Sequence, residues 1–410
     1  MRTLILSDLH LGCGPCPGIF AGSQALGGLL SDLGVGPLRV VLNGDTFDYW
    51  AQVDHRDGAA RVTQALLDDP VNAEVLTRLG QVVLAGGALL VRGGEHDREF
   101  ADASARARVL AALKLVEAQS ARVTFHRLLT PTLLDVGGAR LLVTRGGRDR
   151  EAARRLAELL LNPLRRQYGV GLADLLRPDY VAAVLAAFAV NPTAAKLVLR
   201  QIADDVGWQR LRSDCERALR LTETLAAAGL SVREREVFGL ALDPEVPLGD
   251  AFDNHGALEH ARLKLFRHSL GGRPVTGADG LRSLAGAEWQ AIHAIANRRQ
   301  ASAAVIGHSH IPGWRSEDGL TVVDTGTWTW RVETPEASAS PALWRKTMAT
   351  WQDVARVGLP RAPAPAVRAR FTAAWIEPRL AGQGAHMALV EWRPGQGLVV
   401  LREQDLAPAR

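Results

Sequence analysis

Lysine, cysteine and long hydrophobic runs are all scarce in this sequence of 410 residues. Of its 48 basic residues only four are lysines, and there are three cysteines. An odd, small number of cysteines does not suit the paired framework of a secreted disulfide-rich domain. The longest apolar run covers residues 181–190, which is about half of what a helix needs to cross a bilayer. The sequence therefore predicts neither a disulfide scaffold nor a transmembrane segment.

The first six residues are mainly apolar, with Arg2 and Thr3 as exceptions, and they lead directly into Asp8 and His10. They lack the length and the small-residue cleavage site of a secretory signal peptide. We therefore expect a cytoplasmic protein.

Arginine supplies nearly all of the positive charge, although the formal net charge is only +4. Arginine holds phosphate groups through planar, two-pronged hydrogen bonds. The abundance of alanine and glycine offers a plainer explanation, a GC-rich coding sequence. The charge balance leaves nucleic acid open as a partner without indicating it. Hydrophobic residues at 47% and charged residues at 22% are typical of a globular protein.

A short apolar run that ends abruptly in Gly, Asp, His or Arg occurs five times along the chain. Runs of four to six apolar residues are typical of strands that are buried on both faces. In open α/β sheets, ligands bind beyond the carboxyl ends of the strands. The pattern therefore predicts one composite site at five strand ends. The runs cover residues 3–6, 39–42, 88–91, 141–144 and 303–306.

Helix-compatible segments at 21–33 and 61–79 alternate with the first runs, and this alternation predicts an α/β architecture. From about residue 149 to 300 the chain is dominated by arginine-rich amphipathic stretches. We interpret residues 1–150 and 300–410 as the core and 151–299 as a mostly helical insertion. The insertion could be a structural cap, a lid that shapes substrate access, or a docking module for a protein partner.

The end of the chain contains two further patterns. Residues 332–370 are rich in proline and alanine, which favours irregular surface structure. Residues 387–392 and 398–401 flank a Pro-Gly-Gln-Gly turn and predict a closing β-hairpin.

The residues at the strand ends are those that bind transition metals. Asp8 and His10 lie two apart after the first run, Asp45 follows the second, and His308 and His310 lie two apart after the last. Carboxylate and imidazole together form a ligand set for manganese, iron or zinc. A carboxylate that bridges two such ions is the usual arrangement for attack on phosphorus.

Four motifs carry a resemblance to a known family. The calcineurin-like metallophosphoesterases have successive DxH, GDxxD, GNH[DE], xxHGH and GHTH or GHSH signatures. This chain has SDLH at 7–10, GDTFD at 44–48, GEHD at 94–97 and GHSH at 307–310. Residues 44–50 and 324–328 look especially similar to the branch that includes the UDP-2,3-diacylglucosamine hydrolases. The resemblance implies an α/β two-sheet sandwich flanked by helices, and the insertion lies outside it.

The resemblance also implies roles for individual residues. A first divalent metal, manganese before iron or zinc, would be held by Asp8, His10, Asp45 and His310. A second metal would share Asp45 and add His308, position 95 and position 145. His96 would protonate the leaving oxygen, because imidazole titrates near neutral pH. Asp48 and Asp97 would support these groups.

The sequence departs from the family pattern at the second metal. Position 95 is Glu in place of Asn, and position 145 is Arg in place of His. Glu95 can still bind a metal, whereas Arg145 stays protonated and has no lone pair to offer. The two replacements are complementary in charge, so we expect Arg145 to contact Glu95 and to take the place of the second cation.

Two functional hypotheses follow from that departure. In the first, the protein is a hydrolase with one intact metal site that cleaves a phosphomonoester, a phosphodiester or a pyrophosphate, and Arg145 stabilises phosphoryl charge. In the second, the site has lost its activity, and the protein binds a phosphorylated ligand or partner as a regulatory module.

Cys13 and Cys16 have the spacing of a thioredoxin-type redox pair. No thioredoxin pattern surrounds them. Two interpretations stay open. The segment could be a glycine-proline turn with two incidental thiols, or it could be a redox switch beside the metal site.

Overall fold

The structure is a computed structural model of the whole chain. The residues it describes are 1–12, 20–34, 36–49, 58–126, 130–145, 209, 213, 225–242, 255–271, 280–284, 286–332, 335, 339–357, 367–380 and 382–408. Cys13 and Cys16 lie outside these residues, as do the side chains of Glu95 and His96. The chain divides into two compact units. The first comprises Met1–Gly147, Pro274–Trp330 and Ala369–Arg410, and the second comprises Arg148–Arg273 and Arg331–Arg368.

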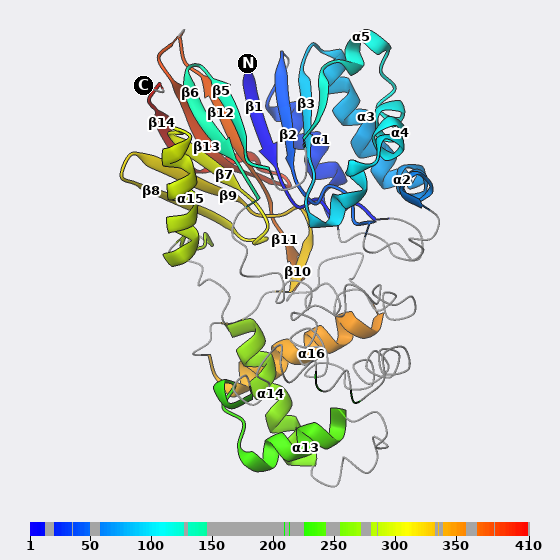
Figure 1. Cartoon of the computed structure of the whole chain (residues 1–410), viewed down its shortest axis with the longest axis vertical. Coiled ribbons are helices and arrows are strands. Elements are labelled where there is room, and N and C mark those ends of the chain that lie inside the picture. The colour runs from blue at the N-terminus through cyan, green and yellow to red at the C-terminus, as the bar shows by residue number, and fades with distance from the viewer. Residues whose placement is uncertain are drawn as a thin grey trace. The chain divides into compact units, whose positions relative to one another are not determined.

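A seven-stranded sheet forms one half of the first unit (Figure 1). Its order is β14-β13-β12-β1-β2-β3-β4; β1 to β4 run parallel, and β12 to β14 are antiparallel to their neighbours. β1 is therefore an inner strand: Leu4 pairs with Val40 on one side and with Trp375 on the other. The strands are β1 (Arg2–Leu6), β2 (Leu38–Asn43), β3 (Ala88–Arg92), β4 (Val123–His126), β12 (Phe371–Pro378), β13 (Ala385–Arg393) and β14 (Gly397–Leu406).

A five-stranded sheet forms the other half, in the order β5-β6-β7-β9-β8. β6, β7 and β9 run parallel, while β5 and β8 pair antiparallel at the two edges. Its strands are β5 (Thr132–Val136), β6 (Ala139–Val143), β7 (Ala303–Ile306), β8 (Pro312–Glu317) and β9 (Leu320–Thr325).

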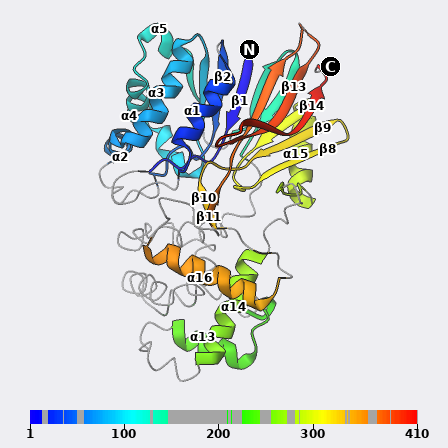
Figure 2. The same cartoon turned by 180° about the vertical axis from the view of Figure 1, so that it is seen from behind.

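The two sheets pack face to face, and helices cover their outer faces (Figures 1 and 2). Because side chains alternate along a strand, Ile5 packs against Val305 between the sheets, whereas Leu4 packs with Leu26 under the helices. Both faces of the inner strands are thus apolar, which explains the continuous hydrophobic runs. The predicted α/β two-sheet sandwich is confirmed. The helices over the seven-stranded sheet include α1 (Ser23–Asp32), α2 (Gly58–Asp68), α3 (Pro70–Leu84), α4 (Ala103–Ala112) and the short α5 (Glu117–Ser120).

A further helix, α15 (Gly286–Arg298), covers the outer face of the five-stranded sheet. Its Trp289 and Ile292 form a buried cluster with Leu142 and Ile306. The first unit resumes at Pro274, so α15 belongs to it although it lies inside the range 151–299.

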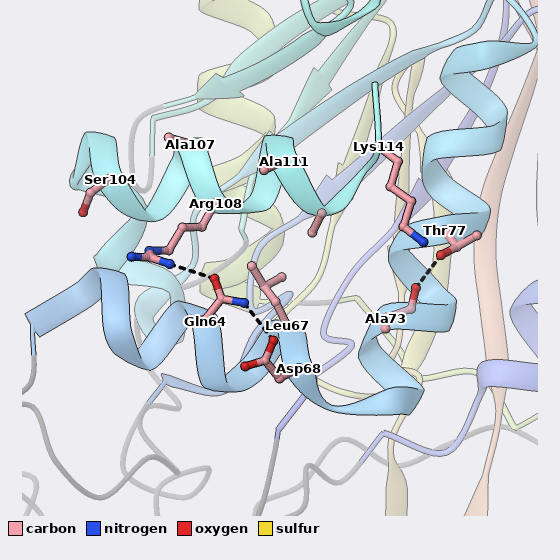
Figure 3. A pocket seen from close by; sticks show the side chains of 11 residues that line it. Gln64, Leu67, Asp68, Ala73, Thr77, Ser104, Ala107, Arg108, Ala111 and Lys114 are labelled. Atoms are coloured by element: carbon pink, nitrogen blue, oxygen red, sulfur yellow. Dashed lines mark hydrogen bonds between the residues drawn. The ribbon is translucent and has the colours of Figure 1, made fainter. Parts of the chain in front are cut away.

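The segment expected to be one helix at 61–79 is two helices. Asp69 begins α3 by accepting hydrogen bonds from the backbone nitrogens of Val71 at 2.9 Å and Asn72 at 3.3 Å. Pro70 occupies the first helical position, where its missing N–H costs nothing. Helices α2, α3 and α4 enclose a pocket of about 660 Å³, in which Gln64 hydrogen bonds to Arg108 and Asp68 (Figure 3).

The expectation of irregular structure across 332–370 is wrong for its centre, which forms helix α16 (Pro341–Val357). Ser340 accepts a hydrogen bond from the backbone nitrogen of Leu343 at 3.3 Å, and Pro341 is the first helical residue. Trp344 and Met348, four residues apart, are buried. The short strands β10 (Trp330–Val332) and β11 (Val367–Ala369) flank this segment and pair with each other.

The described part of the predicted insertion is mainly helical, with a non-helical stretch at 280–284, although most of residues 151–299 lie outside the described residues. Helices α13 (Val232–Leu242) and α14 (His255–Gly271) are joined by an ion pair of 2.9 Å between Lys264 Nζ and Glu234 Oε2. Within the described ranges, no helix combines the length and the hydrophobicity needed to span a membrane.

A buried polar network joins the two sheets near the carboxyl ends of β2, β3 and β6. Asn43 donates to the Thr144 carbonyl at 3.0 Å and accepts from Arg92. Arg92 is 2% exposed, and it also donates to the Thr132 hydroxyl at 3.1 Å and the Thr130 carbonyl at 2.6 Å. Burial, together with the nearby charge of Arg145, lowers the pKa of Arg92 to about 10.

We predict that Asn43→Ala lowers the free energy of unfolding by about 2–3 kcal/mol. The substitution leaves a buried guanidinium and a buried carbonyl without the partner they share, and such groups carry the full desolvation cost. Urea unfolding of the full chain measures the change. Gln64→Ala, which removes two exposed hydrogen bonds, is the control and should change stability by less than about 0.5 kcal/mol. Equal effects of the two substitutions would contradict this role of Asn43.

Candidate metal centre

The loops that follow β1 and β2 are joined by backbone hydrogen bonds. The Asp8 nitrogen donates to the Gly44 carbonyl at 3.1 Å, and the His10 nitrogen donates to the Asp45 carbonyl at 2.9 Å. Because β1 and β2 are parallel neighbours, their loops leave the sheet at the same edge. The first three predicted ligands are therefore brought together by strand order alone.

The second sheet contributes from the opposite side. The nitrogen of His308, after β7, donates to Asp8 Oδ2 at 2.8 Å. The nitrogen of Gly307 donates to the carbonyl of Arg145, which follows β6, at 3.4 Å. The strand ends of both sheets thus meet at Asp8, as the predicted composite site requires.

The predicted ligands share an unusual backbone conformation. Eight non-glycine residues in the described part of the chain have positive φ, and five of them are predicted ligands. For L-residues this left-handed conformation costs roughly 1–2 kcal/mol each, and Asp and His tolerate it better than most. Strain of this kind gathers at functional sites, where the surrounding structure holds it in place. The five φ values are Asp8 56°, His10 51°, Asp45 47°, His308 77° and His310 60°.

Two glycines allow the loops to approach this closely. A Cβ on Gly94 would collide with the backbone nitrogen and the carboxylate of Asp45. A Cβ on Gly307 would lie 2.5 Å from Ser7 Oγ and 2.7 Å from Asp8 Oδ2. The glycines of the predicted motifs therefore have a steric function at the site.

The side chains of Asp8, His10 and His310 form a group that could hold a metal ion. Their nearest ligand atoms all lie within 4.8 Å of one another. Asp8 Oδ1 is 3.3 Å from His310 Nε2 and 3.9 Å from His10 Nε2, and Asp45 Oδ2 is 3.7 Å from His10 Nε2. Two atoms bound to one ion at about 2.1 Å lie about 3–3.5 Å apart, so small adjustments would complete the site. The donor set fits a divalent ion.

Arg145 is placed against the carboxylates of this group. It is 6% exposed, its Nη2 lies 3.1 Å from Asp8 Oδ1, and it forms an ion pair with Asp45 Oδ2. The expected contact with Glu95 lies outside the described side chains. The guanidinium therefore pairs with two of the predicted metal ligands, a contact that the sequence did not predict.

The two supporting carboxylates have different positions. Asp97 is buried and accepts from the backbone nitrogens of Thr46 at 2.9 Å, Phe47 at 2.8 Å and Gly94 at 3.2 Å. Burial and then the charge of Asp45 raise the pKa of Asp97 to about 7, while these hydrogen bonds oppose the rise. Its carboxylate shapes the loop after β2.

Asp48, the other supporting residue, lies with its Oδ2 3.9 Å from His10 Nδ1, beyond hydrogen-bond range. His308 is not part of the ligand group found among the described residues, although its neighbour His310 is. His96 lies in the 3₁₀ helix η3 (Glu95–Ala101), which begins directly after Gly94.

The sequence did not reveal a buried ion pair next to the His308–His310 loop. Arg282 and Asp324 are 2% and 0% exposed, and Arg282 Nη2 lies 2.5 Å from Asp324 Oδ2. Burial raises the pKa of Asp324 to about 6, against the opposing effect of Arg282. Arg282 belongs to no motif, so no local signal identified it.

No family model matches the chain, and no curated protein matches its sequence. Among solved structures, it is similar to a single mutant of Vps29 from Entamoeba histolytica, with 8% identity and 99% of each chain covered. The TM-score of 0.33 is too low for this likeness to carry an argument. The functional assignment therefore rests on the residues of the site.

We predict that Gly307→Ala weakens manganese binding by about tenfold or more, because the new methyl group must displace Ser7 or Asp8. Isothermal titration with Mn²⁺ measures the affinity. Gly256→Ala is the matched control, since its Cβ would meet no atom within 4 Å. Unchanged manganese affinity in Gly307→Ala would show that the close approach of Gly307 to Ser7 and Asp8 is not needed for binding.

Proposed function

We propose that the protein is a metal-dependent phosphoesterase with one metal site, built from Asp8, His10, Asp45 and His310. The observation that carries this proposal is the meeting of five strained Asp and His residues at the strand ends of both sheets. Four of the five would be the metal ligands. Five of the eight described non-glycine residues with positive φ are these potential ligands, and backbone strain of this kind gathers at functional sites.

The donor set favours manganese, iron or zinc, since it combines carboxylate oxygen with imidazole nitrogen. Such an ion, when bound, acts as a Lewis acid towards a phosphoryl oxygen. The protein's contribution is to fix the donors before binding. Asp8, His10 and Asp45 are fully buried, so their positions are set by packing and by backbone hydrogen bonds.

Arg145 is proposed to take the place of a second metal. Its positive charge is permanent, and its planar group can hold two phosphoryl oxygens. Two carboxylates, Asp8 and Asp45, contribute two negative charges, while Arg145 and one divalent ion together contribute three positive charges. A second divalent ion beside Arg145 would add like charge in a buried site and would be disfavoured. The charge balance therefore supports one metal per chain.

We propose that His96 protonates the leaving oxygen of the phosphate ester. The proposal rests on its motif and on its position at the start of η3, next to the glycine that contacts Asp45. The substrate class is a phosphomonoester, a phosphodiester or a pyrophosphate. The insertion is proposed to shape access to this site or to dock a protein partner.

A second function is favoured by the ion pairs of Arg145. Because the guanidinium pairs with both Asp8 and Asp45, it offsets part of their negative charge without a metal. In this alternative, the protein binds a phosphorylated ligand or partner and does not hydrolyse it. Metal content and hydrolysis, measured on the same preparation, separate the two functions.

We predict about one manganese per chain in the unmodified protein, with hydrolysis of an aryl phosphodiester. Asp45→Ala should lose both, because it removes a buried ligand. Asp68→Ala, which removes an exposed carboxylate on α2, is the control and should keep both. Elemental analysis after gel filtration gives the stoichiometry. Metal retained in Asp45→Ala would overturn the ligand assignment, and metal without hydrolysis in the unmodified protein would favour the binding function.

We predict that Arg145→His combined with Glu95→Asn raises the stoichiometry to about two metals per chain. The double substitution restores two neutral donors and removes the permanent charge that repels a second ion. Hydrolysis should increase with the second metal. Arg298→His on the surface of α15 is the control for a new histidine. A stoichiometry that stays at one, with the fold intact, would show that Arg145 does not stand in for a metal.

A further inference from the structure

A second buried ionic network lies in the first unit, apart from Arg145. Arg282 donates from Nε to Asp324 Oδ2 at 2.9 Å and from Nη2 to the same oxygen at 2.5 Å. Its Nη1 and Nη2 also donate to the carboxylate of Glu288, in the first turn of α15, at 2.6 and 3.0 Å. A guanidinium bound on two sides in this way is fixed in orientation.

Asp324 connects Arg282 to the loop that follows β7. Its Oδ2 accepts from the Ser309 hydroxyl at 2.6 Å, and its Oδ1 accepts from the Gly326 nitrogen at 2.9 Å. The Ser309 oxygen accepts in turn from the Ile311 nitrogen at 3.1 Å. Ser309 is thus held at a fixed distance from a buried carboxylate, between two histidines in the left-handed conformation.

The backbone of Arg282 reaches the far end of the same loop. Its nitrogen donates to the Pro312 carbonyl at 2.8 Å, and residue 282 forms a parallel bridge with Gly313. Nearby, Arg315 donates to the Leu284 carbonyl at 2.7 Å and stacks on Trp289. Residues 281–284 therefore lie along the start of β8, directly after the histidine loop.

We infer that Arg282 and Asp324 are positioning residues that hold His310 in place for metal binding, with Ser309 as the connecting group. The inference rests on the proposed metal site and extends it to Arg282, which lies outside every recognised motif, and to Ser309 and Asp324, for which no role had been assigned. Arg282 supplies the charge that keeps Asp324 a strong acceptor in a buried position. Asp324 orients Ser309 by a charge-assisted hydrogen bond, and Ser309 restrains the φ angle of the next residue, His310.

The physical reason for such a device is the strain of the loop. His308 and His310 both have positive φ, at 77° and 60°, so the loop would relax if nothing opposed it. Relaxation would turn the His310 ring away from Asp8, whose Oδ1 now lies 3.3 Å from His310 Nε2. Groups that orient metal ligands in this way typically account for about 10–100-fold in metal affinity.

The test compares Ser309→Ala with Ser309→Thr in the full chain. Ser309→Ala should weaken Mn²⁺ binding by about tenfold, whereas Ser309→Thr keeps the hydroxyl and should stay within about twofold of the unmodified protein. Ser120→Ala is the matched control, since it removes a serine hydroxyl of α5 that donates to the Val116 carbonyl, outside the Arg282 network. It should also stay within about twofold.

The cobalt-loaded proteins supply a second measurement that a loss of stability would not change. Visible absorption bands of Co²⁺ report ligand geometry, so Ser309→Ala should alter them and Ser309→Thr should not. Arg282→Met should show the same loss of Mn²⁺ affinity and the same change in the Co²⁺ spectrum as Ser309→Ala. If Arg282→Met does not fold, the comparison of Ser309→Ala with Ser309→Thr alone tests the inference.

The outcomes separate this inference from the function it rests on. Metal bound by the unmodified protein, with the same affinity and the same cobalt spectrum in Ser309→Ala, would overturn the positioning role alone. An equal loss in Ser309→Ala and Ser120→Ala would also overturn it, because the effect would then be general. No metal bound by the unmodified protein would overturn both the inference and the proposed metal site.

Discussion

The burial of two carboxylates at the junction of the two sheets is the constraint on which the rest of the site depends. Asp8 and Asp45 are fully buried, and ionised carboxylates are stable there only if positive charge and hydrogen-bond donors surround them. The fold provides a hydrogen bond from the backbone N–H of His308 and the positive charge of the Arg145 guanidinium. It also brings imidazole rings close enough to bind a metal ion together with the carboxylates. Each strand end is needed for one of these, so the two sheets have to pack with their carboxyl ends together.

The fold and the position of the site could be predicted from the sequence because they follow from local patterns. Residues 4–6 and 303–306 are apolar throughout because both faces of β1 and β7 are buried. Their ends carry Asp8 and His310, which the structure brings to 3.3 Å across 302 positions of sequence. Helix α16 was missed since proline and alanine obscured a valid start at Ser340 and Pro341.

Interactions that depend on the packing of distant segments could not be predicted in the same way. Arg145 was expected beside Glu95 because their charges complement each other, yet the described contacts of its guanidinium include Asp8 and Asp45. The order of the strands and the direction of the side chain decide which carboxylate an arginine contacts. A sequence motif contains neither kind of information. Arg282 pairs with Asp324 across 42 positions, and nothing in the sequence around Arg282 indicates this partner.

The left-handed backbone at the predicted ligands has a consequence for the kinds of metal that the proposed site could accept. Glycine aside, Asp, Asn and His are the residues that tolerate this conformation best. Drift at Asp8, His10, Asp45 or His310 is therefore restricted to exchanges among oxygen and imidazole donors, while cysteine would add conformational cost. The backbone conformation of these loops therefore favours oxygen and imidazole donors over thiolates. Metal ions that prefer thiolate ligands would be at a disadvantage in any related sequence that keeps the same loops.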